Sequence, residues 1–190
     1  MALLGSVDKV EGLKLIQALV PKNKTDAPPN TYTGNFGRSE FPLHTDLAQW
    51  AIPPRYIGLR CIRGFDNVAT RLIDSKNVIS AIGKDALRMT LVQPRRPFSN
   101  GKQLMRLLEL RGKLWSIRWD SLFLVPASKF SLTIFQKVKE HLDTCMPREI
   151  SLINRGDTLI VDNWRLLHGR SAALNFENRR IERVYLKDLR

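Results

Sequence analysis

Cysteine is scarce in this chain of 190 residues, and long hydrophobic runs are absent from it. The two cysteines, Cys61 and Cys145, lie too far apart in the sequence to suggest a metal-binding pair, so we expect buried thiols in a reducing compartment. Without a run of roughly 18 apolar residues, the sequence predicts no membrane span. The first nine residues also lack the basic-then-apolar layout of a secretory signal, and we therefore expect a cytoplasmic protein.

Acidic residues are few as well: 18 stand against 31 lysines and arginines, which gives a formal net charge of +13. High positive charge favours binding to nucleic acid or to anionic surfaces. The basic residues are dispersed, however, with pairs such as Arg95-Arg96 and no long runs, and the aromatic motif of RNA-binding sheets is missing. We therefore favour a solvated basic surface over a nucleic-acid partner.

Apolar periodicity predicts a mainly β chain with flanking helices. Val10, Leu13, Ile16 and their neighbours indicate an amphipathic helix over 7–20, followed by a proline-rich linker. Strands are expected at 56–62, 149–153, 158–161 and 180–186, a hairpin at 105–110 and 114–119, and helices at 74–82 and 131–142. In the last helix we expect Leu132, Phe135, Val138 and Leu142 on the buried face and His141 on the surface.

His44, Asp46 and, far downstream, His168 supply the ligand set of a mononuclear non-haem iron(II) site, which leaves coordination positions open. In an extended segment alternate side chains point to the same face, so His44 and Asp46 can reach one ion while Thr45 points away. His168 must then come from a strand that lies beside them in space. Such non-local pairing is typical of a β-barrel or sandwich.

Several stretches around these residues follow one another in an informative order. They are 41–46 (FPLHTD), 53–64 (PPRYIGLRCIRG), 70–74 (TRLID), 117–120 (IRWD), 156–163 (GDTLIVDN) and 179–185 (RRIERVY). This set resembles the iron(II)/2-oxoglutarate dioxygenases of the taurine dioxygenase and clavaminate synthase type. The resemblance covers residues 32–186 and implies a double-stranded β-helix, or jelly roll. We expect a single dioxygenase domain over 1–190, with 1–30 as N-terminal helix and linker and 31–190 as the core.

The resemblance also implies which residues bind 2-oxoglutarate. An arginine fork pairs two-on-two with a carboxylate, and a neighbouring hydroxyl adds a third hydrogen bond. Arg179 and Arg183 match the paired arginines of the family and share one face of a strand by alternation, whereas Arg180 points the other way. A change of one residue in the preceding loop would favour Arg180 instead. Thr70 is the candidate hydroxyl.

Two further residues, Asp162 and Asn163, precede the strand of the distal histidine. Their side chains can orient a metal ligand through hydrogen bonds. Ordinary turn chemistry explains them equally well.

Iron(II), 2-oxoglutarate and O2 are therefore the expected cofactor and co-substrates. The resemblance implies hydroxylation of an unactivated carbon in a small, amino-acid-like substrate, free or carrier-bound, with release of succinate and CO2. Only 43 residues precede His44, fewer than in most relatives. The short chain therefore leaves three expectations open. The site can be open to a large or protein-bound substrate, or a partner subunit or a second copy can close it. The alternative is a truncated, inactive barrel that serves as a basic binding module for nucleic acid or protein.

Overall fold

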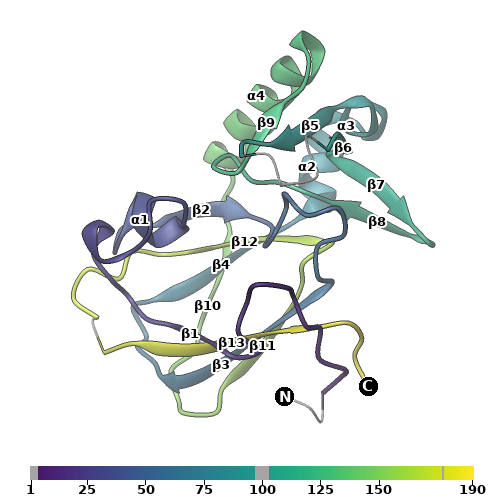
Figure 1. The fold of residues 1–190 in the computed structure, drawn as a ribbon. Helices are drawn as coiled ribbons and strands as arrows, with labels where there is room; N and C mark the ends of the chain where they lie inside the picture. The colour runs from purple at the N-terminus through teal and green to yellow at the C-terminus, as the bar shows by residue number, and fades with distance from the viewer. Residues whose placement is uncertain (1–3, 97–102, 177) are drawn as a thin grey trace.

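Two four-stranded antiparallel sheets face each other in the computed structural model, which describes residues 4–96, 103–176 and 178–190 (Figure 1). The first sheet has the order β1 (Gln17–Leu19), β13 (Arg180–Leu186), β3 (Tyr56–Arg63) and β11 (Thr158–Asp162). The second has the order β10 (Arg148–Ser151), β4 (Ala69–Asp74), β12 (Leu166–Arg170) and β2 (Phe41–His44). This arrangement is the expected double-stranded β-helix.

A smaller layer of strands and helices lies on one side of these sheets, above β2 and β12 in Figure 1. It contains a three-stranded sheet, β6 (Met105–Arg106), β5 (Leu91–Pro94) and β9 (Leu124–Pro126), and the hairpin β7 (Leu108–Arg111) with β8 (Leu114–Ile117). Its helices are α2 (Ser75–Ile82), α3 (Lys84–Met89) and α4 (Lys129–Thr144). The predicted hairpin is confirmed, except that Met105 and Arg106 pair with β5 instead.

The barrel interior follows from alternation along the strands. In β3, Ile57, Leu59 and Cys61 are buried, whereas Arg60 between them is exposed. They pack with residues from β11 and β13, including Ile181. Alternate side chains of a strand point to opposite faces, so β13 also directs every second residue from Ile181 onward into the barrel. This register brings polar residues of β13 to the site described below.

The longest helices were predicted from capping and spacing. Asp74 caps α2 by accepting a hydrogen bond from the backbone N–H of Lys76 at 3.0 Å. Ser128 caps α4 in the same way. Within α4 the buried face contains Ile134 in place of Leu132, which is 45% exposed. That single assignment was wrong because the buried stripe runs through Ser131 and Ile134 instead of Leu132.

The predicted helix over 7–20 is wrong. The only regular element in residues 7–20 is the strand β1, and its Gln17 pairs with Arg183 at the edge of the first sheet. Gly12 has a φ of 75°, which a right-handed helix does not accommodate. The open edge of β13 offers backbone hydrogen bonds that β1 satisfies, and this tertiary pairing outweighs the apolar spacing. The linker contains a 3-10 turn, η1 (Lys24–Asp26), and leads to α1 (Tyr32–Phe36).

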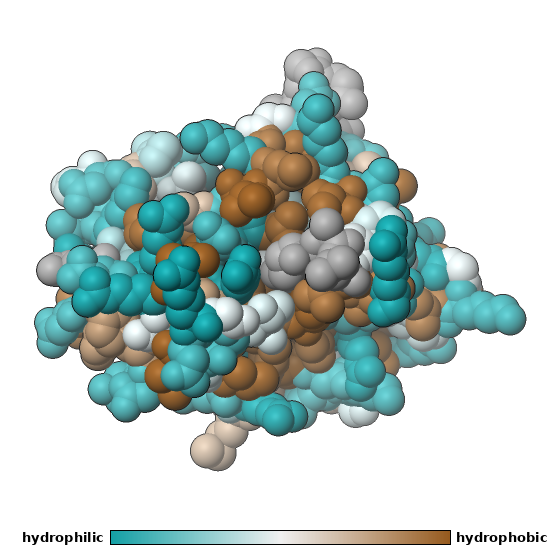
Figure 2. All heavy atoms as spheres, turned by 90° about the horizontal axis from the view of Figure 1, so that it is seen from below, coloured by the Kyte–Doolittle hydropathy of each residue, from teal (hydrophilic) through white to brown (hydrophobic). Residues whose placement is uncertain are grey.

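The surface is mixed in character. Figure 2 looks at the molecule from below and shows hydrophilic side chains around apolar ones that gather near the middle of this face. Among the described residues, no helix combines the length and apolar content needed to cross a membrane. Cys61 is a buried free thiol as expected, whereas Cys145 is only partly buried.

Candidate metal centre

His44, Asp46 and His168 meet in the interior of the barrel. His44 ends β2 and stands directly opposite His168 of β12 in the register of the second sheet, which confirms the expected neighbouring strands. Their Nε2 atoms lie 3.4 and 3.6 Å from Oδ1 of Asp46, and all three residues are buried. Within the described ranges they form the only group of at least three histidine, cysteine or acidic residues able to hold a metal ion. The donor set fits iron(II).

The orientation of His44 is fixed from two sides. Its Nδ1 lies 2.8 Å from the carbonyl oxygen of Pro42, which can only accept, so Nδ1 carries the proton and Nε2 presents its lone pair to the centre. The ring of Tyr32 from α1 stacks on the imidazole, with centroids 4.0 Å apart. Both contacts hold the imidazole in the position that a metal ligand needs.

The surrounding charges shift the pKa values of the triad in different directions. Burial raises the pKa of Asp46, but Arg183 and the two histidines outweigh it, and the pKa falls well below its usual value. Burial lowers the pKa of His44, and Asp46 more than offsets this, so the pKa is raised. Burial and the charge of His44 lower the pKa of His168. The lowered pKa of Asp46 favours the ionised carboxylate that a metal ligand needs, and the lowered pKa of His168 favours its neutral imidazole.

The turn that contains Asp46 is clamped by Asn163. The backbone N–H of Asp46 donates to the Asn163 side-chain oxygen at 2.7 Å, and the Asn163 amide donates back to the carbonyl of Asp46 at 3.0 Å. Leu47, next in the chain, has a φ of 55°, a conformation rare outside glycine. Asn163 thus positions Asp46, whereas Asp162 caps its own turn through the N–H of Trp164. Of the two interpretations, ligand orientation applies to Asn163 and turn chemistry to Asp162.

The 117–120 stretch supports the same turn from the other side. The buried Arg118 donates hydrogen bonds to the carbonyls of Ala48, Trp50 and Ala51 at 2.6, 2.7 and 3.1 Å. The backbone N–H of Trp119 donates to the hydroxyl of Thr45 at 3.0 Å. The segment that follows the metal pair is therefore fixed by residues more than 60 positions away in sequence.

Replacing Gly169 with alanine tests how closely β2 and β12 must approach each other. A Cβ atom on Gly169 would lie 2.6 Å from the carbonyl oxygen of Phe41 on β2. Gly169→Ala should therefore separate the strands that carry His44 and His168, at about 1–3 kcal/mol of stability. We expect a fall in Tm of roughly 3–10 °C by differential scanning fluorimetry, together with weaker metal binding.

Gly156→Ala is the control for this change. Gly156 lies in a turn with a φ of 100° and open space around it, so alanine there adds backbone strain without pushing two strands apart. Loss of metal affinity in both variants, or in neither, would contradict the proposed role of the close approach at Gly169.

A cavity of about 850 Å³ opens onto the triad. Thr70, Arg179 and Arg183 all line it, whereas Arg180 is exposed and does not. Arg179 is 5% exposed, and its Nε has no hydrogen-bond partner within the described part of the chain. Burial lowers its pKa. Nearby Arg170 has its pKa lowered to about 10 by burial and by the charge of Arg179. The cavity therefore contains buried positive charge suited to an anion.

Arg183 has a different set of contacts from the one the sequence suggested. Its Nη1 donates to Oδ2 of Asp46 at 2.6 Å, and its Nη2 donates to Oε1 of Gln17 at 2.7 Å. Both ends of the guanidinium fork are thus engaged by the protein. Arg183 lines the cavity as expected, but Arg179 is the better placed of the two to bind an incoming carboxylate.

Sequence reasoning missed three residues at the site. Tyr185 donates a hydrogen bond to Asp46, Tyr32 covers His44, and Asp120 presents a carboxylate to the cavity wall. Strand alternation from Arg183 would have indicated Tyr185, because the two lie two positions apart. Asp120 belongs to the 117–120 motif but was not assigned a role. Tyr32 had no signal, since it reaches His44 from a short separate helix.

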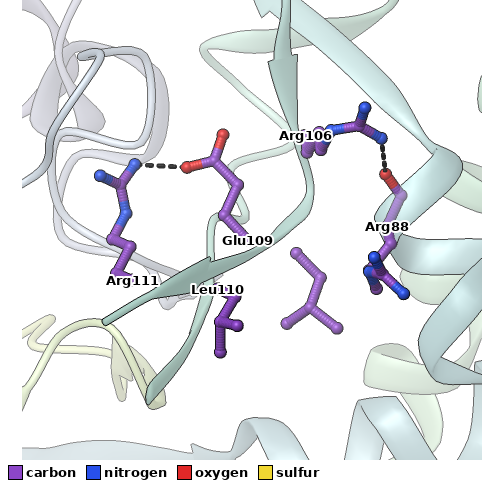
Figure 3. A pocket seen from close by; sticks show the side chains of 6 residues that line it. Arg88, Arg106, Glu109, Leu110 and Arg111 are labelled. Carbon is purple, nitrogen blue, oxygen red and sulfur yellow. Dashed lines mark hydrogen bonds and ion pairs between the residues drawn. The ribbon is translucent and has the colours of Figure 1, made fainter. Parts of the chain in front are cut away.

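A second hollow of about 420 Å³ lies on the smaller layer, along β7 (Figure 3). Its arginines already have partners: Arg106 donates to the carbonyl of Arg88 at 2.7 Å, and Arg111 donates to Glu109 at 2.5 Å. None of the triad residues lines it. The chemistry of the chain is therefore concentrated in the larger cavity.

Solved structures of iron oxygenases share this fold. Asparagine oxygenase, in complex with Fe(II), 3-hydroxyasparagine and succinate, gives a TM-score of 0.71 at 20% identity, covering 96% of this chain and 60% of that one. The non-haem iron oxygenase OrfP, with iron, succinate and (3S)-hydroxy-L-arginine, gives 0.68 at 21%, covering 92% and 57%. PvcB from Pseudomonas aeruginosa gives 0.63 at 18%, covering 96% and 66%.

No protein-family model and no curated protein matches the sequence. The chain spans about 60% of the length of the first two structures. The expected double-stranded β-helix is confirmed by these matches. The TM-scores establish a shared fold, but at identity near 20% activity has to be argued from the site.

Proposed function

We propose that this chain is an iron(II)- and 2-oxoglutarate-dependent oxygenase that hydroxylates an unactivated carbon of a small, amino-acid-like substrate. One observation carries the proposal: a buried two-histidine, one-carboxylate triad and a buried arginine, whose Nε has no partner among the described residues, open onto the same cavity. Two imidazoles and one carboxylate with open positions are the ligand set of non-haem iron(II) oxygenases. The shared fold of asparagine oxygenase and OrfP supports the same reaction class.

His44, Asp46 and His168 would hold the iron, and Arg179 with Thr70 would hold the distal carboxylate of 2-oxoglutarate. Metal and oxoacid, when bound, supply the activation of O2 and the oxidation of the carbon, with succinate and CO2 as by-products. The protein orients the ligands, keeps water out of the buried end of the cavity and positions the target carbon. A guanidinium fork and a hydroxyl that line the same cavity can bind a carboxylate together.

The amino-acid-like substrate is proposed on the basis of the cavity wall. Asp120 is buried there, and its Oδ1 accepts hydrogen bonds from the N–H groups of Leu122 and Phe123 at 2.8 Å. Burial raises the pKa of its carboxyl. An ammonium group would stabilise the ionised carboxylate at this position. Asparagine oxygenase and OrfP were captured with hydroxylated amino acids, which is in keeping with such a substrate.

The volume of the cavity lies within the range of small-molecule sites and leaves room for a carrier-bound amino acid as well as a free one. We include in the proposal a second copy or a partner subunit that closes the cavity. The free thiols of Cys61 and Cys145 favour a reducing, cytoplasmic setting.

The test is an anaerobic titration of the purified chain with iron(II) and then 2-oxoglutarate, followed by visible absorption. We expect a charge-transfer band from the chelated oxoacid in the wild type and none in His168→Ala. A folded wild-type protein without the band would contradict the proposal. A salt-sensitive nucleic-acid gel shift that is unchanged in His44→Ala would then favour the basic binding module instead.

A further inference from the structure

The two oxygens of the Asp46 carboxylate face different surroundings. Oδ1 lies 3.4 Å from Nε2 of His44 and 3.6 Å from Nε2 of His168, at the centre of the triad. Oδ2 points away from the centre and accepts two hydrogen bonds, from Nη1 of Arg183 at 2.6 Å and from the hydroxyl of Tyr185 at 2.9 Å. A carboxylate held in this way has one oxygen free for a metal ion.

Both donors come from β13, and their spacing has a structural cause. Arg183 and Tyr185 are two residues apart, so they point to the same face of the strand and into the barrel. Tyr185 is 2% exposed, and its hydroxyl has Asp46 as its partner. A phenol buried in an otherwise apolar cluster with Ile57 and Ile181 costs free energy unless its hydroxyl is bonded. The Asp46 carboxylate meets that requirement.

Arg183 also connects the carboxylate to the N-terminal segment. Its second terminal nitrogen donates to Gln17 of β1, which is the register partner of Arg183. The guanidinium is therefore held at both ends and cannot rotate toward the cavity without losing two hydrogen bonds. Residues that flank Gln17, among them Leu19 and Pro21, line the cavity. The docking of β1 thus fixes the group that holds Asp46.

We propose that Tyr185 and Arg183 are positioning residues that hold Oδ2 of Asp46, so that the carboxylate offers only Oδ1 to the metal. This inference rests on the proposed function, because it concerns the same metal site. Binding through one oxygen leaves more coordination positions open than binding through two, and open positions are what an oxygenase needs for its co-substrates. It also assigns Arg183 to the metal ligand and leaves Arg179 to the oxoacid.

Tyr185→Phe tests the inference with Co²⁺ as the probe, since its visible d–d absorption reports ligand geometry without turnover. Partners that orient metal ligands typically contribute 10–100-fold to affinity, so we expect Co²⁺ to bind roughly 10-fold or more weakly. We also expect a changed d–d spectrum at saturating Co²⁺. Tyr56→Phe is the matched control: it removes a hydroxyl from the adjacent strand β3, at the register partner of Leu186, and should leave both readouts unchanged.

The outcomes separate the inference from the proposed function. Failure of the wild type to bind Co²⁺ would overturn both. Binding by the wild type and by Tyr185→Phe with equal affinity and identical spectra would overturn the inference and leave the proposed function standing. A lower Tm with an unchanged saturated spectrum would show a merely structural tyrosine and would also overturn it. Should Tyr185→Phe fail to fold, Arg183→Lys serves, because a lysine keeps the charge but cannot engage Asp46 and Gln17 together. The same weakening and spectral change are expected of it.

Discussion

Replacing His168 with alanine should abolish iron-dependent conversion of 2-oxoglutarate to succinate. The side chain supplies one of only three protein donors at the centre, and no other described histidine lines the cavity beside His44. Loss of a partner that merely orients a ligand typically costs 10–100-fold in affinity or activity, so loss of a ligand should cost at least about 100-fold. The measurement is succinate release from wild type and variant with iron(II), 2-oxoglutarate, O2 and a mixture of amino acids.

The chain contains its own control for this experiment. Its remaining histidine, His141, lies on α4 beside Asn77 and does not line the cavity. His141→Ala removes the same side chain from the surface and should keep wild-type turnover. His168→Ala should keep its circular dichroism spectrum, since Nδ1 of the imidazole makes no hydrogen bond within the described part of the chain. Near-wild-type turnover in folded His168→Ala would refute the triad.

The grouping of His44, Asp46 and His168 could be predicted from the sequence because it needs only an extended segment and a neighbouring strand. His44 and Asp46 are close in sequence and need only an extended segment, and His168 needs only a strand beside it. The structure pairs His168 with His44 directly, although Asp46 itself lies in the turn after β2. Asp46 lies two residues beyond the end of β2, and Asn163 holds it in place by clamping that turn. The sequence therefore identified the three residues of the triad but not the role of Asn163 in holding Asp46.

The contacts of Arg183 and the course of the N-terminus could not be predicted in this way. An apolar spacing over 7–20 is compatible with a helix in isolation, and only the open edge of β13 makes a strand at Gln17 preferable. The same pairing places Gln17 against Arg183 and turns the guanidinium toward Asp46. Both errors therefore have one cause, a tertiary pairing between residues more than 160 positions apart.

Arg179→Gln is expected to raise the 2-oxoglutarate requirement while leaving iron binding intact. The guanidinium is buried in the cavity wall, and no described carboxylate forms an ion pair with it, so an incoming carboxylate would be its counter-charge. Removing one partner of a buried, hydrogen-bonded charge pair costs about 2–5 kcal/mol, which corresponds to roughly 30-fold or more in affinity. The measurement is the concentration of 2-oxoglutarate that gives half of the charge-transfer band.

The same substitution should have the opposite effect on the stability of the protein without 2-oxoglutarate. A buried, unpaired charge destabilises a fold, so Arg179→Gln should leave Tm unchanged or raise it. Arg180→Gln is the matched control: its side chain is exposed and neither readout should change. If only Arg180→Gln raised the 2-oxoglutarate requirement, Arg180 would be the arginine that binds the oxoacid, as a one-residue change in the preceding loop would predict. A large fall in Tm for Arg179→Gln would instead identify a structural arginine. An arginine that lowers the stability of the free protein and raises its affinity for 2-oxoglutarate serves ligand binding and not the fold.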